Sequence, residues 1–179
     1  MSDQAPEFSR LVDVNRIPVE GFEETIAADP DECTHLAERL GVVRLLALTA
    51  TFTLMPWRHG GVRVRGRVRA EVEQTCVVSL DNFVAIVSED VERCFVGDNE
   101  PGRSGVVVDV DSLEGDEPDL VSDGKIDLGE LAAETLVLAL DPYPRKPGAT
   151  FAAVGHDQTG GSPVQRESPF GVLAKWPRK

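Results

Sequence analysis

Hydrophobic residues recur with a helical period in one early segment of the chain. They fall at spacings of three and four, which places them on one stripe of an α-helix: Cys33, Leu36, Ala37 and Leu40. Asp29 precedes the stripe as an N-cap, Pro30 suits the first helical position, and Glu32 completes a capping box. Gly41 is a natural stop. The pattern predicts a helix from about Pro30 to Leu40 with one buried face.

From residue 46 the period changes to two, the period of β-strands. Three long segments alternate, separated by turns at 59–61 and near 81–82. Residues expected to face the core are Leu46, Leu48, Ala50, Phe52 and Leu54, then Val62, Val64, Gly66, Val68, Ala70 and Val72, and then Phe83, Ala85, Val87, Val91 and Phe95. Long strands joined by short turns make an antiparallel meander. Two short strands are expected before it, at about 8–14 and 21–28.

Acidic residues gather in the second half of the chain. Between Gly97 and Glu134 there are 12 Asp and Glu residues against two basic ones, so this region carries most of the net charge of −13. Its Gly, Pro and Ser content predicts a mobile acidic insert, about residues 97–126, with one strand fragment at 106–108.

A second helix is predicted from Asp127 to Ala139. Asp127 and Glu130 have capping-box spacing, and Pro142 and Pro144 end the helix. Its apolar stripe comprises Leu128, Leu131, Ala132, Leu136 and Ala139.

These elements predict an α+β domain, residues 1–150, whose antiparallel β-meander sheet is packed by two helices. Residues 151–179 are expected to be a flexible tail, because 155–168 is rich in Gly, Gln, Ser and Pro. The tail regains apolar residues at its end, where a docking motif is expected: Pro169, Phe170, Leu173 and Trp176. The alternative is that this segment completes the core of the domain.

Composition narrows the cellular setting. Three cysteines without a close pair fit a reducing compartment better than a disulfide framework. The first ten residues lack the apolar run of a secretory signal, and no stretch of 18 apolar residues occurs. We therefore expect a cytoplasmic protein without membrane contact.

One strand carries a row of arginines. Arg63, Arg65, Arg67 and Arg69 alternate with the expected core residues, so they share one face at a spacing of about 6.6 to 7 Å, near the phosphate spacing of RNA. Arg58 precedes the row, and the twelve residues 58–69 contain no acid. Because the whole chain is acidic, an RNA contact has to be local. The alternative is a solvated face whose arginines pair with acidic residues of neighbouring strands, such as Glu89 and Glu92, or with the acidic insert.

The sequence contains few features typical of catalytic or cation-binding sites. His35, His59 and His156 are far apart in the sequence, and no Ser-His-Asp set, HExxH helix or glycine-rich phosphate loop occurs. The acidic run 109–116 fails as an EF-hand loop, because Leu113 takes the fifth position and Gly115 the seventh. We therefore expect a protein that is not an enzyme and has no cofactor.

Three motifs resemble a known family. They are Gln74-Thr75-Cys76-Val77-Val78-Ser79-Leu80, the segment from Asp127-Leu128-Gly129-Glu130-Leu131 to Leu140-Asp141-Pro142-Tyr143-Pro144, and Ser168-Pro169-Phe170-Gly171-Val172-Leu173-Ala174-Lys175. In this order and spacing they are similar to the YceD family. The resemblance implies a bacterial, non-enzymatic protein that supports accumulation or processing of large-subunit (23S) ribosomal RNA.

The chain departs from the family at one place. Many members carry two cysteines, two residues apart, with further cysteines near the end of the fold, which looks like a structural zinc site. Here Ser79 stands where the second cysteine would be, and 143–148 contains none. One thiol cannot hold a structural zinc ion. We therefore expect no bound metal and interpret Cys76 as a buried, inert thiol, and Cys33 and Cys94 as packing residues.

The resulting hypothesis is a ribosome-biogenesis factor that contacts rRNA, or a pre-ribosomal particle, through Arg58, Arg63, Arg65, Arg67 and Arg69. The alternative is an acidic adaptor that holds a basic large-subunit ribosomal protein without touching RNA. The sequence does not indicate an oligomeric state.

Overall fold

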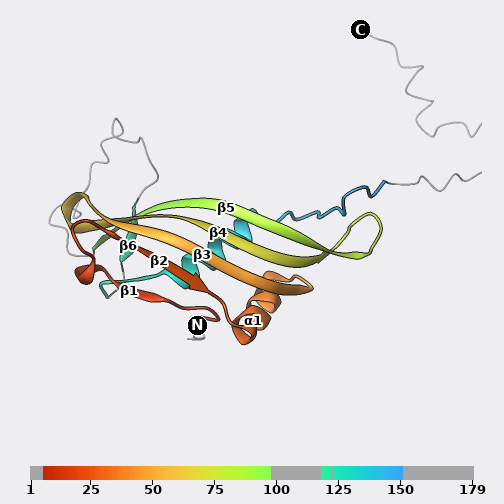
Figure 1. Cartoon of the computed structure of the whole chain (residues 1–179), viewed down its shortest axis with the longest axis horizontal. Coiled ribbons are helices and arrows are strands. Elements are labelled where there is room, and N and C mark those ends of the chain that lie inside the picture. The colour runs from red at the N-terminus through yellow and green to blue at the C-terminus, as the bar shows by residue number, and fades with distance from the viewer. Residues whose placement is uncertain (1–5, 98–117, 122, 151–179) are drawn as a thin grey trace, which may run out of the picture. The chain divides into compact units, whose positions relative to one another are not determined.

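The structure is a computed structural model, and it describes residues 6–97, 118–121 and 123–150 (Figure 1). A boundary in the chain follows Ala149. The strands are β1 (Leu11–Asp13), β2 (Phe22–Ala27), β3 (Arg44–Trp57), β4 (Gly61–Thr75), β5 (Asn82–Gly97), β6 (Asp119–Val121) and β7 (Lys125–Asp127). The helices are α1 (Pro30–Leu40) and α2 (Leu128–Ala139), with 3-10 turns η1 (Val14–Arg16) and η2 (Arg58–Gly60).

The main sheet has five strands in the order β2-β3-β4-β5-β6. The first four are neighbours in both sequence and space and pair antiparallel, while β6 pairs parallel to the last residues of β5. The predicted mixture of helices and a mostly antiparallel sheet is confirmed, but the sheet is mixed and not purely antiparallel. Strands β6 and β7 lie within residues 119–127, most of which were expected to belong to a mobile loop. β7 pairs with β1 in a second, two-stranded sheet.

Helix α1 has the predicted bounds because its signals are local. The Asp29 carboxylate accepts hydrogen bonds from the N–H groups of Asp31 and Glu32, and the Glu32 side chain accepts one from the Asp29 N–H. Gly41 ends the helix in the left-handed region, at φ 66°. The Glu32 carboxylate also binds Arg10 through two contacts, at 2.7 and 2.9 Å, which lowers the pKa of Glu32. The pair joins α1 to the N-terminal segment.

The alternation predicted for β4 is confirmed. Val62, Val64, Val68, Ala70 and Val72 are buried, together with Leu48, Ala50, Phe52 and Leu54 of β3. Gly66 lies opposite Phe52, where a Cβ atom would clash with the Phe52 ring and the Thr51 carbonyl oxygen. Glycine is therefore required for the close approach of β3 and β4 at this point.

The predicted orientation of Leu46 is wrong. A bulge between Leu45 and Ala47 inserts one residue into the ladder, so Leu45 is buried and Leu46 is 41% exposed. A bulge reverses the inside-outside order on one side of it. A period of two read along a single strand does not reveal it.

The N-terminal segment is held against α2. Asp127 caps α2 and also accepts hydrogen bonds from the Ser9 hydroxyl and the Arg10 N–H. The predicted strand at 8–14 is shortened to Leu11–Asp13, since Asp13 starts η1. Glu130 does not complete a capping box; its carboxylate binds Arg39 of α1 at 2.6 Å. The two helices are therefore joined by an ion pair.

Both helices pack on the same face of the main sheet, where the core lies, with α1 against β3 and α2 against β4 and β5 (Figure 1). The opposite side of strands β2 to β5 is called here the outer face. No side chain of the outer face is buried. The residues of the outer face are Glu23, Thr25, Thr49, Thr51, Thr53, Met55, Arg63, Arg65, Arg67, Arg69, Glu71, Glu73, Val84, Ile86, Ser88, Asp90, Glu92 and Cys94. It is an open surface four strands wide.

Candidate nucleic-acid interface

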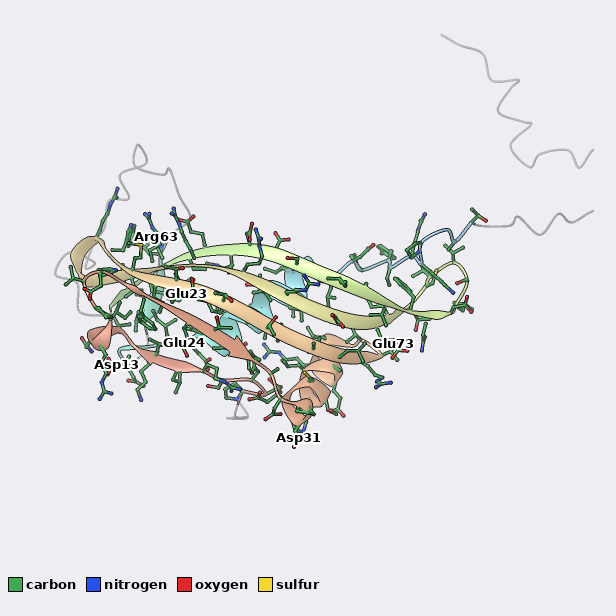
Figure 2. The ribbon with its side chains drawn as sticks, viewed as in Figure 1. Asp13, Glu23, Glu24, Asp31, Arg63 and Glu73 are labelled. Carbon is green, nitrogen blue, oxygen red and sulfur yellow. The ribbon has the colours of Figure 1, made fainter. Side chains whose placement is uncertain are left out.

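The arginine row lies on the outer face. Arg63, Arg65, Arg67 and Arg69 alternate with buried valines and alanine along β4, flanked by Thr49, Thr51, Thr53 and Met55 of β3 on one side and Ser88, Asp90, Glu92 and Cys94 of β5 on the other. Figure 2 places Arg63 near one end of the sheet and Glu73 near the other. The strand ladder thus holds the arginines in one line.

Acidic residues of β5 pair with the middle of the row. Arg67 makes two contacts to Asp90, at 2.6 and 2.9 Å, and Arg65 contacts Glu92 at 2.9 Å. These hydrogen bonds lower the pKa values of Asp90 and Glu92. Of the partners considered from the sequence, Glu92 is one, whereas Glu89 lies opposite Val68 on the core side of the sheet.

Pairing with acids does not neutralise the row. The Glu92 carboxylate serves Arg65 and also lies 3.6 Å from Nε of Arg63. Within the described part of the chain, Asp90 and Glu92 are the only ion-pair partners of the five candidate arginines. Two carboxylates therefore face the four guanidinium groups of the row, and this part of the outer face keeps an excess of positive charge.

A tryptophan stands at the basic end of the face. Trp57 closes β3 two residues after Met55, which lies opposite Arg63. The guanidinium carbons of Arg58 and Arg63 lie 5.6 and 5.8 Å from the centre of the Trp57 ring, within cation–π range. The buried Nε of Arg63 has no hydrogen-bond partner among the described residues. Trp57 was not identified as a candidate from the sequence, because its proximity to Arg63 arises only when the β3–β4 hairpin forms.

The other end of the outer face has a different character. Glu71 lies opposite Ile86 and Glu73 opposite Val84. Ile86 is 61% and Val84 53% exposed. The outer face therefore has a basic, aromatic end near Trp57 and Arg63 and an acidic, apolar end near Glu73 and Val84.

Cys76 lies in the loop between β4 and β5 and is fully buried, as predicted. Its sulfur accepts hydrogen bonds from the N–H groups of Val78 and Ser79, both at 3.4 Å. Hydrogen bonds from Ser79, side chain and backbone, lower the pKa of the Cys76 thiol to about 6. The thiol is thus not the ordinary neutral group expected from burial alone, which raises the pKa of Cys33 in the core.

The segment that follows α2 lies beside this loop. The Val77 N–H donates to the Pro144 carbonyl at 3.0 Å, and the Lys146 ammonium lies 3.5 Å from an Asp81 carboxylate oxygen. Segments 76–81 and 143–149 are therefore neighbours. Across the described ranges, no group of three or more His, Cys, Asp or Glu side chains is placed to hold a metal ion.

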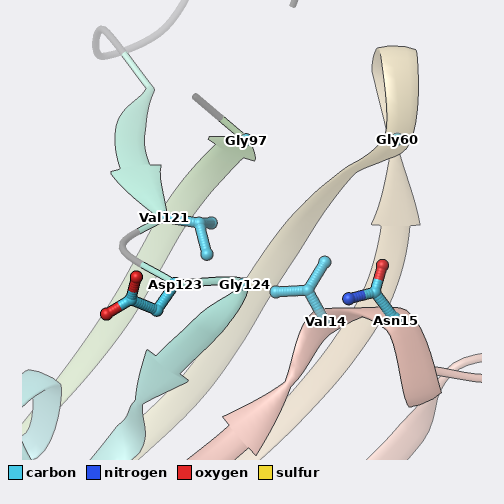
Figure 3. A pocket seen from close by; sticks show the side chains of 7 residues that line it. All are labelled: Val14, Asn15, Gly60, Gly97, Val121, Asp123 and Gly124. Atoms are coloured by element: carbon cyan, nitrogen blue, oxygen red, sulfur yellow. The ribbon is translucent and has the colours of Figure 1, made fainter. Parts of the chain in front are cut away.

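A hollow of about 490 Å³ lies beside the η2 turn (Figure 3). Its lining consists of Val14, Asn15, Gly60, Gly97, Val121, Asp123 and Gly124. Among these described residues, only Asn15 and Asp123 offer polar side chains, and none of them is a cationic group that could bind an RNA phosphate.

Other predicted features fall elsewhere. The docking residues Pro169, Phe170, Leu173 and Trp176, the acidic run 109–116 and the strand fragment 106–108 lie outside the described residues. Cys94 alternates with Phe95 as predicted, facing Arg63 on the outer face. In the described part of the chain, neither α1 nor α2 has the length and apolar content to cross a membrane.

Comparison with known proteins gives one result. Neither the curated proteins nor the solved structures provide a significant match to the chain. Residues 64–175 match the family model described as large ribosomal RNA subunit accumulation protein YceD. The matched region includes most of β4, all of β5 and α2, and the Cys76 loop. Since the match covers more than half of the 179 residues, the chain belongs to the YceD family.

Proposed function

We propose that this protein is a non-enzymatic ribosome-biogenesis factor that supports accumulation of large-subunit rRNA by binding that RNA through its outer face. Family membership gives the biological context. The observation that carries the binding surface is the charge pattern along the arginine row, where two carboxylates of β5, Asp90 and Glu92, pair with a row of four guanidinium groups on a face with no buried side chain. We place this activity in the cytoplasm.

The ion pairs do not argue against this role. Side chains of Arg65, Arg67, Asp90 and Glu92 are 50 to 70% exposed. Exposed pairs contribute about 0 to 1 kcal/mol to stability, so a phosphate can replace a carboxylate at small cost.

The test is a variant with Arg63, Arg65, Arg67 and Arg69 replaced by Gln. The core face of β4 is untouched, so the fold should persist. If each arginine neutralises about one phosphate, the variant should lose the steep salt dependence of binding to 23S rRNA fragments. The matched control replaces the same number of exposed cations outside the outer face: Arg16, Lys125, Arg145 and Lys146. An unchanged salt slope in the quadruple variant would refute the assignment.

A second candidate function is an adaptor that holds a basic ribosomal protein. The observation in its favour is the acidic, apolar end of the outer face at Glu71, Glu73, Val84 and Ile86. Replacing Glu71 and Glu73 with Gln should then release the basic protein and leave RNA binding intact, whereas the arginine variant should do the reverse.

A further inference from the structure

We propose that Trp57, with Arg58 and Arg63, is a stacking site for an unpaired RNA base at the basic end of the outer face. The proposal rests on the proposed function, because it names the form of RNA that the same face takes.

The position of Trp57 carries the first step. It follows Met55 by two residues on β3, and Met55 lies opposite Arg63, so strand alternation directs Trp57 to the outer face. The ring is half-buried, and its neighbour Met55 is 48% exposed. An indole in the core would be explained by packing alone, but this one stands beside the arginine row at its end.

The two arginines carry the second step. The guanidinium groups of Arg58 and Arg63 stand 5.6 and 5.8 Å from the ring centre and are held there by cation–π attraction. A nucleobase can stack on an indole ring or on a guanidinium plane. The cluster thus offers a flat, cationic, polarizable surface, which matches a base attached to a phosphate.

An unused donor carries the third step. Nε of Arg63 has no hydrogen-bond partner in the described part of the chain, and the Glu92 oxygen at 3.6 Å lies beyond hydrogen-bonding distance. This Nε is buried, so a phosphate oxygen would satisfy it only if the Arg63 side chain shifts as the attached base stacks on the cluster. Since bases inside an A-form duplex are already stacked and their faces are covered, the ligand is single-stranded RNA, a loop or a bulge.

The experiment uses the full chain and three probes: a single-stranded RNA octamer, the same octamer as a duplex, and inorganic polyphosphate. Binding is followed by anisotropy or competition, and stacking by tryptophan fluorescence. The single strand should quench emission strongly, whereas polyphosphate should bind without quenching. In Trp57→Phe, which keeps a stacking ring, the quench should disappear with little change in affinity, and this identifies Trp57 as the reporter.

Trp57→Leu removes the ring. We expect about a 5- to 150-fold loss of affinity for the single strand, with affinity for polyphosphate unchanged. Melting temperatures of both variants check the fold; if Trp57→Leu does not fold, the quench in the native chain and its loss in Trp57→Phe still decide the question.

Two results would overturn the inference and have different meanings. If the octamer binds without quenching, or if single strand and duplex bind equally, the stacking site is wrong and the RNA function survives. If neither the octamer nor polyphosphate binds, the proposed function fails and the stacking site fails with it.

Discussion

Arg67 and Asp90 face each other across β4 and β5 and make a two-contact ion pair, at 2.6 and 2.9 Å, with both side chains about two-thirds exposed. The pair lies on the surface assigned to RNA. Asp90 is therefore a competitor for the guanidinium group that a phosphate would bind, and the same is true of Glu92 beside Arg65. This relationship makes the acidic side chains of β5 a sensitive test of the surface.

Replacing Asp90 with Asn and Glu92 with Gln should strengthen RNA binding. The change frees Arg65 and Arg67 and removes two negative charges from the path of the phosphates, so affinity at moderate salt should rise by about tenfold. The melting temperature should change little, because exposed ion pairs contribute at most about 1 kcal/mol. The matched control is Glu38→Gln with Glu134→Gln, which changes the net charge equally on exposed helix positions. An equal gain in both variants would mean that net charge alone is responsible.

Gly66→Ala should destabilise the domain by about 1 to 3 kcal/mol, because the new methyl group would overlap the Phe52 ring and the Thr51 carbonyl oxygen. Denaturant unfolding measures the loss. Gly97→Ala is the control, since its Cβ position has no atom within 4 Å from the described residues other than Gly97 and its chain neighbours. Equal stability of Gly66→Ala and the native chain would contradict the packing described for β3 and β4.

Cys76 should titrate near pH 6. Because hydrogen bonds from Ser79 lower its pKa in the folded chain to about 6, whereas an unfolded thiol titrates at about 8.5, folding favours the thiolate. This stabilisation is complete above the pKa of the unfolded thiol, declines as pH falls, and is absent below about 6. Thiolate absorbance near 240 nm should show the step, and Cys76→Ala should remove it. A first step near pH 8.5 in the native protein would contradict the geometry of the loop.

Asp127→Ala should lower stability by about 2 kcal/mol. The carboxylate caps α2 through the N–H groups of Gly129 and Glu130 and also holds Ser9 and the Arg10 N–H. Glu134→Ala, at an exposed position of the same helix, is the control. The midpoint of denaturant unfolding provides the comparison, and similar midpoints for both variants would show that Asp127 does not anchor the N-terminal segment.

Local signals made much of the fold predictable. Helix α1 could be defined to the residue because its cap, first turn and stop all lie within 13 positions. The burial alternation of β4 was equally clear, since both of its faces are uniform. By contrast, the bulge at Leu45 and Ala47 depends on how β3 meets β4, and the strands β6 and β7 are short, so neither has a distinct signature in the sequence.

The candidate site was predictable in part. Alternation placed the arginines on one face, and the same alternation would have identified Asp90 as a partner, because Glu89 shares the parity of Val87 and Val91 and must lie on the core side. Trp57 is different. Its relation to Arg63 depends on the register of the β3–β4 hairpin, which the η2 turn fixes and the sequence pattern does not.

The most direct measurement of the central claim is ultraviolet crosslinking in living cells, comparing the native chain with the variant that carries Gln at 63, 65, 67 and 69. We expect the native chain to crosslink to large-subunit rRNA, with the crosslinked peptides in β3 and β4, and the variant to lose these crosslinks at equal protein level. Equal crosslinking of both proteins to rRNA, or recovery of a basic ribosomal protein without any RNA, would contradict the account.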